Sequence, residues 1–501
     1  MTAYDNFEND LIQNEEDTDE INYGTPDPNS EISKVPCGGC GALLHCKVSI
    51  SPDEYPKILS IIRNKQALVV LMVDLMDFPC SIWPGIADIL GPKTPIVVVG
   101  NKVDLLPRDG KKFLSRVEQN LLDHIRLSGF ATSNILNVSL ISAKSGFGVE
   151  ALITRLHSLW KHKGDVYLVG CTNVGKSSLF NALLQSDYCK IQASDLIQRA
   201  TISHWPGTTL NMLKFPIMRP TGQRLYWRHK RLMEEQRFAA KEAKLRTEVL
   251  KTDNVAAHAT LIGRIGQTYS RDNDTDVEVK DCFLMSTKTN DPGNVRMGID
   301  ENHPEYALSR WCFDTPGVVQ PNQILHLLTI EELMHTIPKE IIRPQTFCVK
   351  PGTSLFIAGL ARLDFLKGPG SVRLTVFRSN ALPVTLCHLE VADSIYEECL
   401  GTELFKVPVP SAIRLSKWPG LESTKPFVVT GAGRRTSCND VVLSSAGWVA
   451  ITPLKVGDFE FQAWTPEKRG IYIRDSLLPE AVTLKGPRIS RSVAYKYNKF
   501  I

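Results

Sequence analysis

The sequence predicts an α/β fold with a mostly parallel sheet, followed by a mostly β C-terminal domain. Two observations lead to this prediction. Between residues 67 and 314, short apolar runs typical of buried strands alternate with helical patterns, as in a parallel sheet covered by helices. From residue 343 onward, runs rich in Val, Thr and Phe are broken by Gly and Pro, which favours further strands.

The expected strands of the parallel sheet are the apolar runs 67–73, 95–100, 135–142, 166–170 and 311–314. Most of these runs end in a polar or glycine-bearing loop with a recognisable motif. Ligands of such sheets bind beyond the carboxyl ends of the strands. We therefore expect the motif loops to converge on one site.

The length and charge of the chain indicate several regions. A chain of 501 residues is long enough for two or three domains. Residues 1–31 hold ten acidic residues and no Lys or Arg, so the rest of the chain has 58 basic and 44 acidic residues, a balance of +14. This basic body suits a polyanionic partner such as RNA, and a solvated basic surface is the alternative.

We expect an acidic disordered leader at 1–34, a Cys-containing partial zinc-finger segment at 35–50, the α/β domain at 51–342 with a polar insertion at 215–310, and the C-terminal domain at 343–501.

The composition predicts a soluble globular protein, with 43% hydrophobic and 22% charged residues. The longest apolar run, 67–76, is interrupted by Asp74 and has about half the length of a membrane-spanning helix. No transmembrane segment is expected, although a peripheral association with a membrane remains possible. The sequence does not predict an oligomeric state. The first twenty residues lack an apolar core and arginine, so no secretory signal or mitochondrial presequence is expected there.

Residues 170–177 read GCTNVGKS, follow an apolar run and precede a helical pattern. This is the context of a phosphate-binding loop, whose glycines let backbone N–H groups and the helix N-terminus face the phosphates. We expect Lys176 to reach the β- and γ-phosphates and Ser177 to ligate Mg²⁺. The predicted nucleotide contacts of this loop are Gly170, Asn173, Val174, Gly175, Lys176, Ser177 and Ser178.

The motif NKVD at 101–104 follows another apolar run and has the chemistry that selects guanine. Asp104 can accept hydrogen bonds from the ring N–H and the exocyclic amine, a pattern that adenine does not present. The backbone N–H of Ala143 can complete the pocket, and Lys102 can lie over the ring. The predicted base-pocket residues are Asn101, Lys102, Asp104, Ser142, Ala143 and Lys144, and the predicted nucleotide is GTP.

Two further motifs supply the expected switch residues, DTPG at 314–317 and PGTT at 206–209. Asp314 can hold Mg²⁺ through water, the Gly317 N–H can sense the γ-phosphate, and Thr209 can bind the metal. The predicted catalytic residues are Asn173, Lys176, Thr209, Asp314 and Gly317, and the predicted Mg²⁺ ligands are Ser177, Thr209 and Asp314. Each short motif alone is usually only a turn, but together with the phosphate loop they predict GTP hydrolysis.

Two positions bear on the rate of hydrolysis. Val318 follows Gly317, where many GTPases carry a glutamine that orients water, so hydrolysis should be slow without a partner. Asn173 stands where potassium-stimulated GTPases place an asparagine that helps hold the ion. The alternative is that Asn173 is only a polar loop residue.

The order of the motifs is permuted. Ordinary GTPases run from the phosphate loop through the two switches to Asn-Lys-x-Asp and Ser-Ala-Lys, whereas here the last two motifs come first. The sheet can still close because all motifs lie at the same strand ends. In this order the Asp314 switch leads directly into the C-terminal domain, so nucleotide state could reach residues beyond 343 through order-disorder coupling.

This permuted order, with the strings GNKVDLLP, ISAKSGFGVEALI, GDVYLVGCTNVGKSSLFNALL, RATISHWPGTTLNMLKFP and DTPGVV, resembles the YqeH-type circularly permuted P-loop GTPases. The chain is most similar to their mitochondrial branch, the nitric-oxide-associated proteins. The resemblance implies assembly of the mitochondrial small ribosomal subunit, a role in mitochondrial translation, and binding of the subunit or its rRNA through the C-terminal domain. It also implies a location in the mitochondrial matrix, and a cytoplasmic location is the alternative.

The N-terminal cysteines depart from this family. The family has a zinc site built from two Cys-x-x-Cys pairs, but here Cys37 and Cys40 have no second pair. His45 and Cys46 could substitute, although they are adjacent and a structural zinc needs four ligands. Three alternatives therefore remain for this segment: zinc binding by Cys37, Cys40 and Cys46, loss of the zinc site, or an incomplete segment.

Two basic segments bear on RNA binding. Residues 485–499 hold five basic residues and no acidic one, with Tyr495 and Tyr497 between them. Such residues can bind phosphates and stack on unpaired bases, and a solvated tail with anchoring aromatics is the alternative. Residues 224–251 mix Glu with basic residues and predict a solvated helix.

Two functions remain open at this point. The first is a GTP-driven ribosome assembly factor whose slow turnover times its release from rRNA. The second is a nucleotide-gated RNA-binding scaffold in which hydrolysis is incidental.

Overall fold

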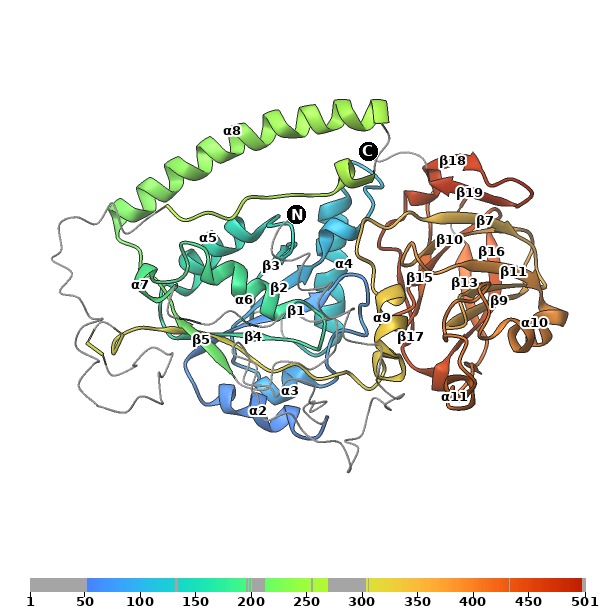
Figure 1. Cartoon of the computed structure of the whole chain (residues 1–501), viewed down its shortest axis with the longest axis horizontal. Coiled ribbons are helices and arrows are strands. Elements are labelled where there is room, and N and C mark those ends of the chain that lie inside the picture. The colour runs from blue at the N-terminus through green and yellow to red at the C-terminus, as the bar shows by residue number, and fades with distance from the viewer. Residues whose placement is uncertain are drawn as a thin grey trace.

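The computed structural model describes residues 52–130, 134–194, 197, 200, 212–253, 256–268, 303–304, 306–431 and 433–497. In the described chain, an α/β domain and a C-terminal β domain lie side by side (Figure 1). The acidic leader, the segment with Cys37, Cys40, His45 and Cys46, and the Thr209 switch lie outside the described residues.

The α/β domain is built on a six-stranded sheet in the order β3-β2-β1-β4-β6-β5. Its strands are β1 (Ala67–Asp74), β2 (Ile96–Asn101), β3 (Ile135–Leu140), β4 (Asp165–Val169), β5 (Leu213–Pro216) and β6 (Trp311–Asp314). All neighbours are parallel except β5 and β6. The five predicted runs thus form the parallel strands. The antiparallel edge strand β5 was not predicted, because its four residues show no periodic pattern.

The apolar runs of this domain follow from burial on both faces of the sheet. All eight side chains of the central strand β1 are buried, which explains why its first seven residues are apolar. The helices on both sides of the sheet in Figure 1 include α2 (Tyr55–Arg63), α3 (Ile86–Leu90), α4 (Phe113–Leu127), α5 (Val149–Trp160), α6 (Lys176–Leu184) and α7 (Ile191–Ser194). The buried positions of α4 recur every four residues and are all apolar, namely Phe113, Val117, Leu121 and Ile125.

The polar insertion forms the long helix α8 (Gly222–Asp253), as the charged pattern predicted. Two arginines near its start fix it to the domain: Arg228 pairs with Glu150 at 2.5 Å, and Arg231 pairs with Glu150 at 2.8 Å and with Asp187 at 3.0 Å. Figure 1 shows α8 running along the outer edge of the α/β domain, with the chain returning beneath it. The acidic partners that anchor α8 lie mainly outside the helix.

The C-terminal domain consists of two antiparallel sheets that share one apolar core. The seven-stranded sheet has the order β17-β14-β15-β10-β7-β19-β18, and the six-stranded sheet has the order β11-β8-β9-β16-β12, with β13 also paired to β16. Phe459, Phe461 and Ala463 alternate into this core along β16. The prediction of a mostly β C-terminal domain is confirmed.

The strands of this domain are β7 (Gln345–Val349), β8 (Thr353–Ile357), β9 (Ala361–Lys367), β10 (Val372–Phe377), β11 (Val384–His388), β12 (Glu422–Ser423), β13 (Phe427–Gly431), β14 (Asn439–Leu443), β15 (Trp448–Pro453), β16 (Gly457–Thr465), β17 (Ile471–Asp475), β18 (Lys485–Arg488) and β19 (Ala494–Tyr497). Helix α9 (Ile330–Thr336) precedes them, and α10 (Ala392–Cys399) and α11 (Ala412–Ser416) lie between them.

A buried arginine joins the two domains. Arg474 on β17 is 4% exposed, and its guanidinium lies 4.2 Å from the ring of Phe78 in the α/β domain and 5.2 Å from the ring of Trp448. It donates one hydrogen bond to the Phe78 carbonyl and lies 3.4 Å from the buried carboxylate of Asp440. The loop that follows β1 is therefore tied directly to the C-terminal sheet.

We expect Arg474→Met to lower the free energy of unfolding by about 3–5 kcal/mol, because Asp440 would keep a buried charge without its partner. Urea unfolding followed by circular dichroism measures the effect. The double variant Arg474→Met/Asp440→Leu should lose clearly less, since no buried charge is left unpaired. Lys425→Met at an exposed position is the control and should change stability by less than about 0.5 kcal/mol. Equal losses in the single and double variants would contradict this account.

Candidate nucleotide-binding site

The phosphate loop connects β4 to α6 at the carboxyl edge of the parallel sheet. Lys176, the first residue of α6, is 6% exposed and donates hydrogen bonds to the carbonyls of Gly170 and Cys171, both at 2.8 Å. Burial lowers the pKa of Lys176, while the nearby Asp314 raises it. The ammonium group is therefore held inside the curve of the loop, where it can meet an anion.

Asp314 at the end of β6 lies beside this loop. The Ser177 hydroxyl donates to Asp314 Oδ2 at 2.9 Å, while Asp314 Oδ1 is buried and has no hydrogen-bond partner among the described residues. Burial raises the Asp314 pKa to about 6, although Lys176 and the Ser177 hydrogen bond lower it. A carboxylate and a hydroxyl, with one carboxylate oxygen unsatisfied, fit the oxygen ligands that Mg²⁺ prefers.

The switch segment after Asp314 lies against the phosphate loop. The Thr172 N–H donates to the Val318 carbonyl at 3.0 Å, and a β-carbon at Gly317 would lie 2.7 Å from the Lys176 ammonium nitrogen. A side chain at position 317 would therefore displace the Lys176 ammonium group from its present place. Val318 is 1% exposed and its side chain has no polar atom that could orient a water molecule.

One amide side chain joins the base motif to two other loops. Asn101 accepts a hydrogen bond from the Ala143 N–H at 2.9 Å and donates one to the Val174 carbonyl at 2.7 Å. A β-carbon at Gly175 would collide with the Asn101 amide nitrogen. The structure thus brings the Asn-Lys-x-Asp, Ser-Ala-Lys and phosphate loops together around Asn101.

Asp104 and Lys102 occupy the remaining part of the base motif. Asp104 is 6% exposed, and burial raises its pKa, with a hydrogen bond from Ser142 acting in the opposite direction. The Lys102 ammonium forms an ion pair with Asp74 at 2.6 Å. Lys144 is exposed, and Ser178 lies one residue beyond Ser177 on α6. Thr209 lies outside the described residues.

Three contacts of this site were not predicted from the sequence. Asp74 orients Lys102, the Tyr55 hydroxyl donates to the Gly170 carbonyl at 3.1 Å, and the return segment of the insertion backs the Ser-Ala-Lys loop through a hydrogen bond from Ser145 to the Leu261 carbonyl at 2.7 Å. Only Asp74 had a sequence signal, since it is a charged residue at the carboxyl end of an apolar strand. The other two contacts depend on tertiary packing.

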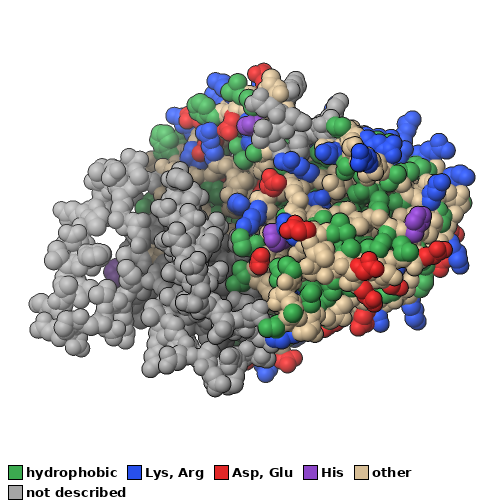
Figure 2. Space-filling view, turned by 45° about the vertical axis from the view of Figure 1, so that its right-hand side comes forward, with side chains coloured by type: hydrophobic (Ala, Val, Ile, Leu, Met, Phe, Trp, Pro, Cys, Tyr) green, Lys and Arg blue, Asp and Glu red, His purple; other side chains and the backbone are tan. Residues whose placement is uncertain are grey.

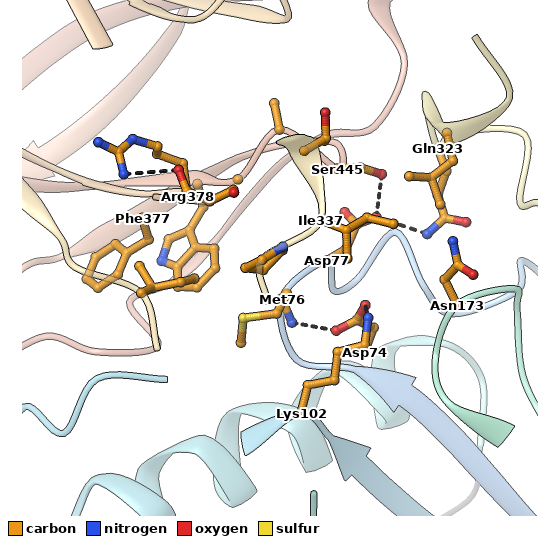
Figure 3. Close-up of a pocket in the computed structure, with 18 of the residues that line it drawn as sticks. Asp74, Met76, Asp77, Lys102, Asn173, Gln323, Ile337, Phe377, Arg378 and Ser445 are labelled. Atoms are coloured by element: carbon orange, nitrogen blue, oxygen red, sulfur yellow. Dashed lines mark hydrogen bonds and ion pairs between the residues drawn. The ribbon is translucent and has the colours of Figure 1, made fainter. Parts of the chain in front are cut away.

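A pocket between the two domains adjoins the phosphate loop (Figure 3). Its volume is about 30 Å³, and its lining includes Asp77, Asn173 and Gln323. Asp77 Oδ2 accepts hydrogen bonds from the Gln323 amide at 2.9 Å and from the hydroxyl of Ser445, in the C-terminal domain, at 2.8 Å. Burial raises the pKa of Asp77 to about 6. The segment after the Asp314 switch and the C-terminal domain therefore both donate a hydrogen bond to the Asp77 carboxylate.

None of the helices in the described part of the chain is long and apolar enough to cross a membrane. Within the same residues, no group of three or more His, Cys, Asp or Glu side chains could hold a metal ion. The Asp314 and Ser177 pair would need oxygen ligands from a nucleotide to complete a Mg²⁺ site.

The comparisons with known proteins agree with this geometry. The family described as "50S ribosome-binding GTPase" matches residues 165–256. The chain is 37% identical to nitric oxide-associated protein 1 of Mus musculus, over 93% of this chain and 73% of the relative. It is 35% identical to the Homo sapiens protein of that name, over 95% and 79%. It is 25% identical to YqeH of Bacillus subtilis, over 86% of both chains.

A relative with more than 30% identity over most of both chains, together with permuted motifs that converge on one site, establishes the family. The chain belongs to the YqeH and nitric oxide-associated protein 1 type of circularly permuted GTPases.

Proposed function

We propose that this GTPase is a GTP-driven assembly factor of the mitochondrial small ribosomal subunit and acts in mitochondrial translation. The observation that carries the enzymatic part is the convergence of the separate motifs around Asn101 and Lys176. The ribosomal part of the proposal rests on the family. The family model that matches residues 165–256 is described by the 50S subunit, so our choice of the small subunit rests on the likeness to YqeH-type proteins.

The proposed roles follow the geometry of the site. Lys176 binds the β- and γ-phosphates, Asp104 selects guanine, and Ser177 and Asp314 hold Mg²⁺. The role of Thr209 as a further Mg²⁺ ligand rests on the sequence motif alone. A bound Mg²⁺ would neutralise charge on the phosphates. The Gly317 N–H reports the γ-phosphate, because this residue already lies against Lys176.

Slow turnover and potassium stimulation are part of the proposal. Val318 offers no polar side-chain atom, so the chain itself lacks the usual water-orienting glutamine at this position. Asn173 has a positive φ of 58° in the phosphate loop and lines the pocket beside the site. Its amide oxygen is the proposed potassium ligand, and the ion would act where other GTPases use an arginine.

RNA binding and location complete the proposal. The strands β18 and β19 carry Lys485, Arg488 and Lys496, all exposed, beside Tyr495 and Tyr497. A relative from Arabidopsis thaliana is named "NO-associated protein 1, chloroplastic/mitochondrial", which supports a mitochondrial location, and we place this chain in the matrix. The second candidate function is an RNA-binding scaffold with incidental hydrolysis, and the apolar Val318 fits both candidates because slow intrinsic hydrolysis is expected in each.

GTP turnover by the purified chain should rise by about ten- to a hundredfold when potassium replaces sodium, and again when small ribosomal subunits are added. Asn173→Ala should lose the potassium gain and keep GTP binding, whereas Asn120→Ala on α4 should keep both. The measurement is phosphate release at constant ionic strength. GTP binding without any gain from potassium or subunits would favour the scaffold.

Lys176→Ala should weaken GTP binding by about a hundredfold, because it removes a buried charge-assisted donor to the phosphates. Binding of a fluorescent GTP analogue measures this loss, with Lys163→Ala at an exposed position as the control. A plain RNA binder would keep both its RNA affinity and its role in cells after Lys176→Ala. That result would rule out a nucleotide-driven function.

The gain in GTP affinity from Mg²⁺ should fall by up to about tenfold per pH unit below pH 6. The Asp314 pKa of about 6 means that a proton then competes with the metal for the carboxylate. The measurement is binding of a fluorescent GTP analogue with Mg²⁺ and with EDTA between pH 5 and pH 8. Asp314→Asn should remove the Mg²⁺ gain together with its pH dependence. A constant Mg²⁺ gain across this range would contradict the assigned role of Asp314.

A further inference from the structure

The loop 106–112 joins the base-reading motif to helix α4 and exposes three cations. Arg108, Lys111 and Lys112 are exposed, and the Arg108 guanidinium lies 5.9 Å from the ring of Phe113. The acidic residue of the loop, Asp109, points inward, where it is 2% exposed and pairs with Arg116 at 2.6 Å. The loop therefore presents positive charge alone to the solvent.

This loop is fixed to the C-terminal domain. Asp109 Oδ2 accepts a hydrogen bond from the Glu480 N–H at 3.0 Å, and Glu480 also pairs with Arg116 at 3.0 Å. The Tyr497 hydroxyl on β19 donates to the Arg108 carbonyl at 3.3 Å. The loop of the α/β domain and the last strand of the C-terminal sheet are thus in direct contact.

The β18–β19 hairpin continues the positive charge from this contact. Lys485 pairs across the hairpin with Tyr497, and Arg488 pairs with Tyr495. The Lys485 ammonium lies 5.7 Å from the Tyr495 ring, and Arg491 in the turn is exposed. Figure 2 shows Lys and Arg side chains gathered along the upper edge of the C-terminal domain, with most Asp and Glu side chains below them.

We propose that the loop 106–112 and the β18–β19 hairpin form one cationic surface that binds the phosphate backbone of RNA across both domains. The inference rests on the RNA-linked function proposed above and adds that the α/β domain itself contacts the RNA. Its partner is a polyanion because two segments that touch carry six exposed cations, namely Arg108, Lys111, Lys112, Lys485, Arg488 and Arg491.

The position of the loop gives this surface a link to the nucleotide. Leu106 lies two residues after Asp104, and the Leu105 carbonyl accepts a hydrogen bond from the Ile342 N–H at 2.9 Å, in the segment leading to β7. RNA bound to the loop would contact a segment that is covalently continuous with the base pocket. Coupling between two such sites is reciprocal, so RNA and GTP would change each other's affinity by the same factor.

The test removes the three loop charges in the full chain, as Arg108→Gln/Lys111→Gln/Lys112→Gln. Fluorescence anisotropy of a labelled oligouridylate of about 20 nucleotides is measured between about 50 and 200 mM KCl. We expect affinity to fall about tenfold or more, and the slope of log affinity against log salt to fall by about 2. The triple control Lys57→Gln/Lys93→Gln/Lys163→Gln removes the same charge from other exposed sites and should change affinity less than about twofold.

A second triple variant, Lys485→Gln/Arg488→Gln/Arg491→Gln, separates the inference from the proposed function. If only this variant lost RNA affinity, RNA would contact the C-terminal domain alone, and the inference would fail while the proposed function survived. If the loop variant and the lysine control fell equally, net charge would explain binding and the inference would fail. Unchanged binding of a fluorescent GTP analogue shows that the loop variant is folded.

Discussion

The nucleotide site depends on one amide side chain, that of Asn101. The oxygen of this amide accepts from the loop that carries Ala143, and its nitrogen donates to the phosphate loop at Val174. Neither a carboxylate nor an apolar side chain could do both, since one cannot donate and the other cannot bond at all. The absence of a β-carbon at Gly175 leaves room for the amide. Three loops that come from distant parts of the sequence are therefore held in one arrangement before any nucleotide arrives.

The permuted order is compatible with this site because the five parallel strands end at the same edge of the sheet. Which strand comes first in the chain does not alter where its loop lies. What the order does change is the segment that follows the switch. After Asp314 the chain passes the phosphate loop at Val318, contributes Gln323 to the Asp77 carboxylate and then enters the C-terminal sheet.

The parallel strands, the helix of the insertion and the motif loops could be predicted from the sequence, because each depends on a local pattern. Burial on both faces made β1 apolar up to its last residue, Asp74, and fixed spacings marked the phosphate and base motifs. Asp77 and Arg474 could not be identified in this way. Their partners lie 246 or more residues away in the case of Gln323 and Ser445, and 396 residues away in the case of Phe78. A local sequence pattern does not predict contacts between residues so far apart in the chain.

The basic residues show the same limit. In the sequence, the charges of the loop 106–112 were mixed with Asp109 and gave no signal, and only the fold turns Asp109 inward and leaves the cations outside.

The contact between the two domains beside the phosphate loop is incompletely hydrogen-bonded. Asp77 Oδ1 and Gln323 Oε1 are buried there without hydrogen-bond partners among the described residues. Unsatisfied buried acceptors cost free energy, and water can satisfy them when the joint opens. The contact beside the phosphate loop should therefore be easier to separate than a fully bonded interface, which would suit the coupling between nucleotide state and the C-terminal domain that the order of the motifs leads us to expect.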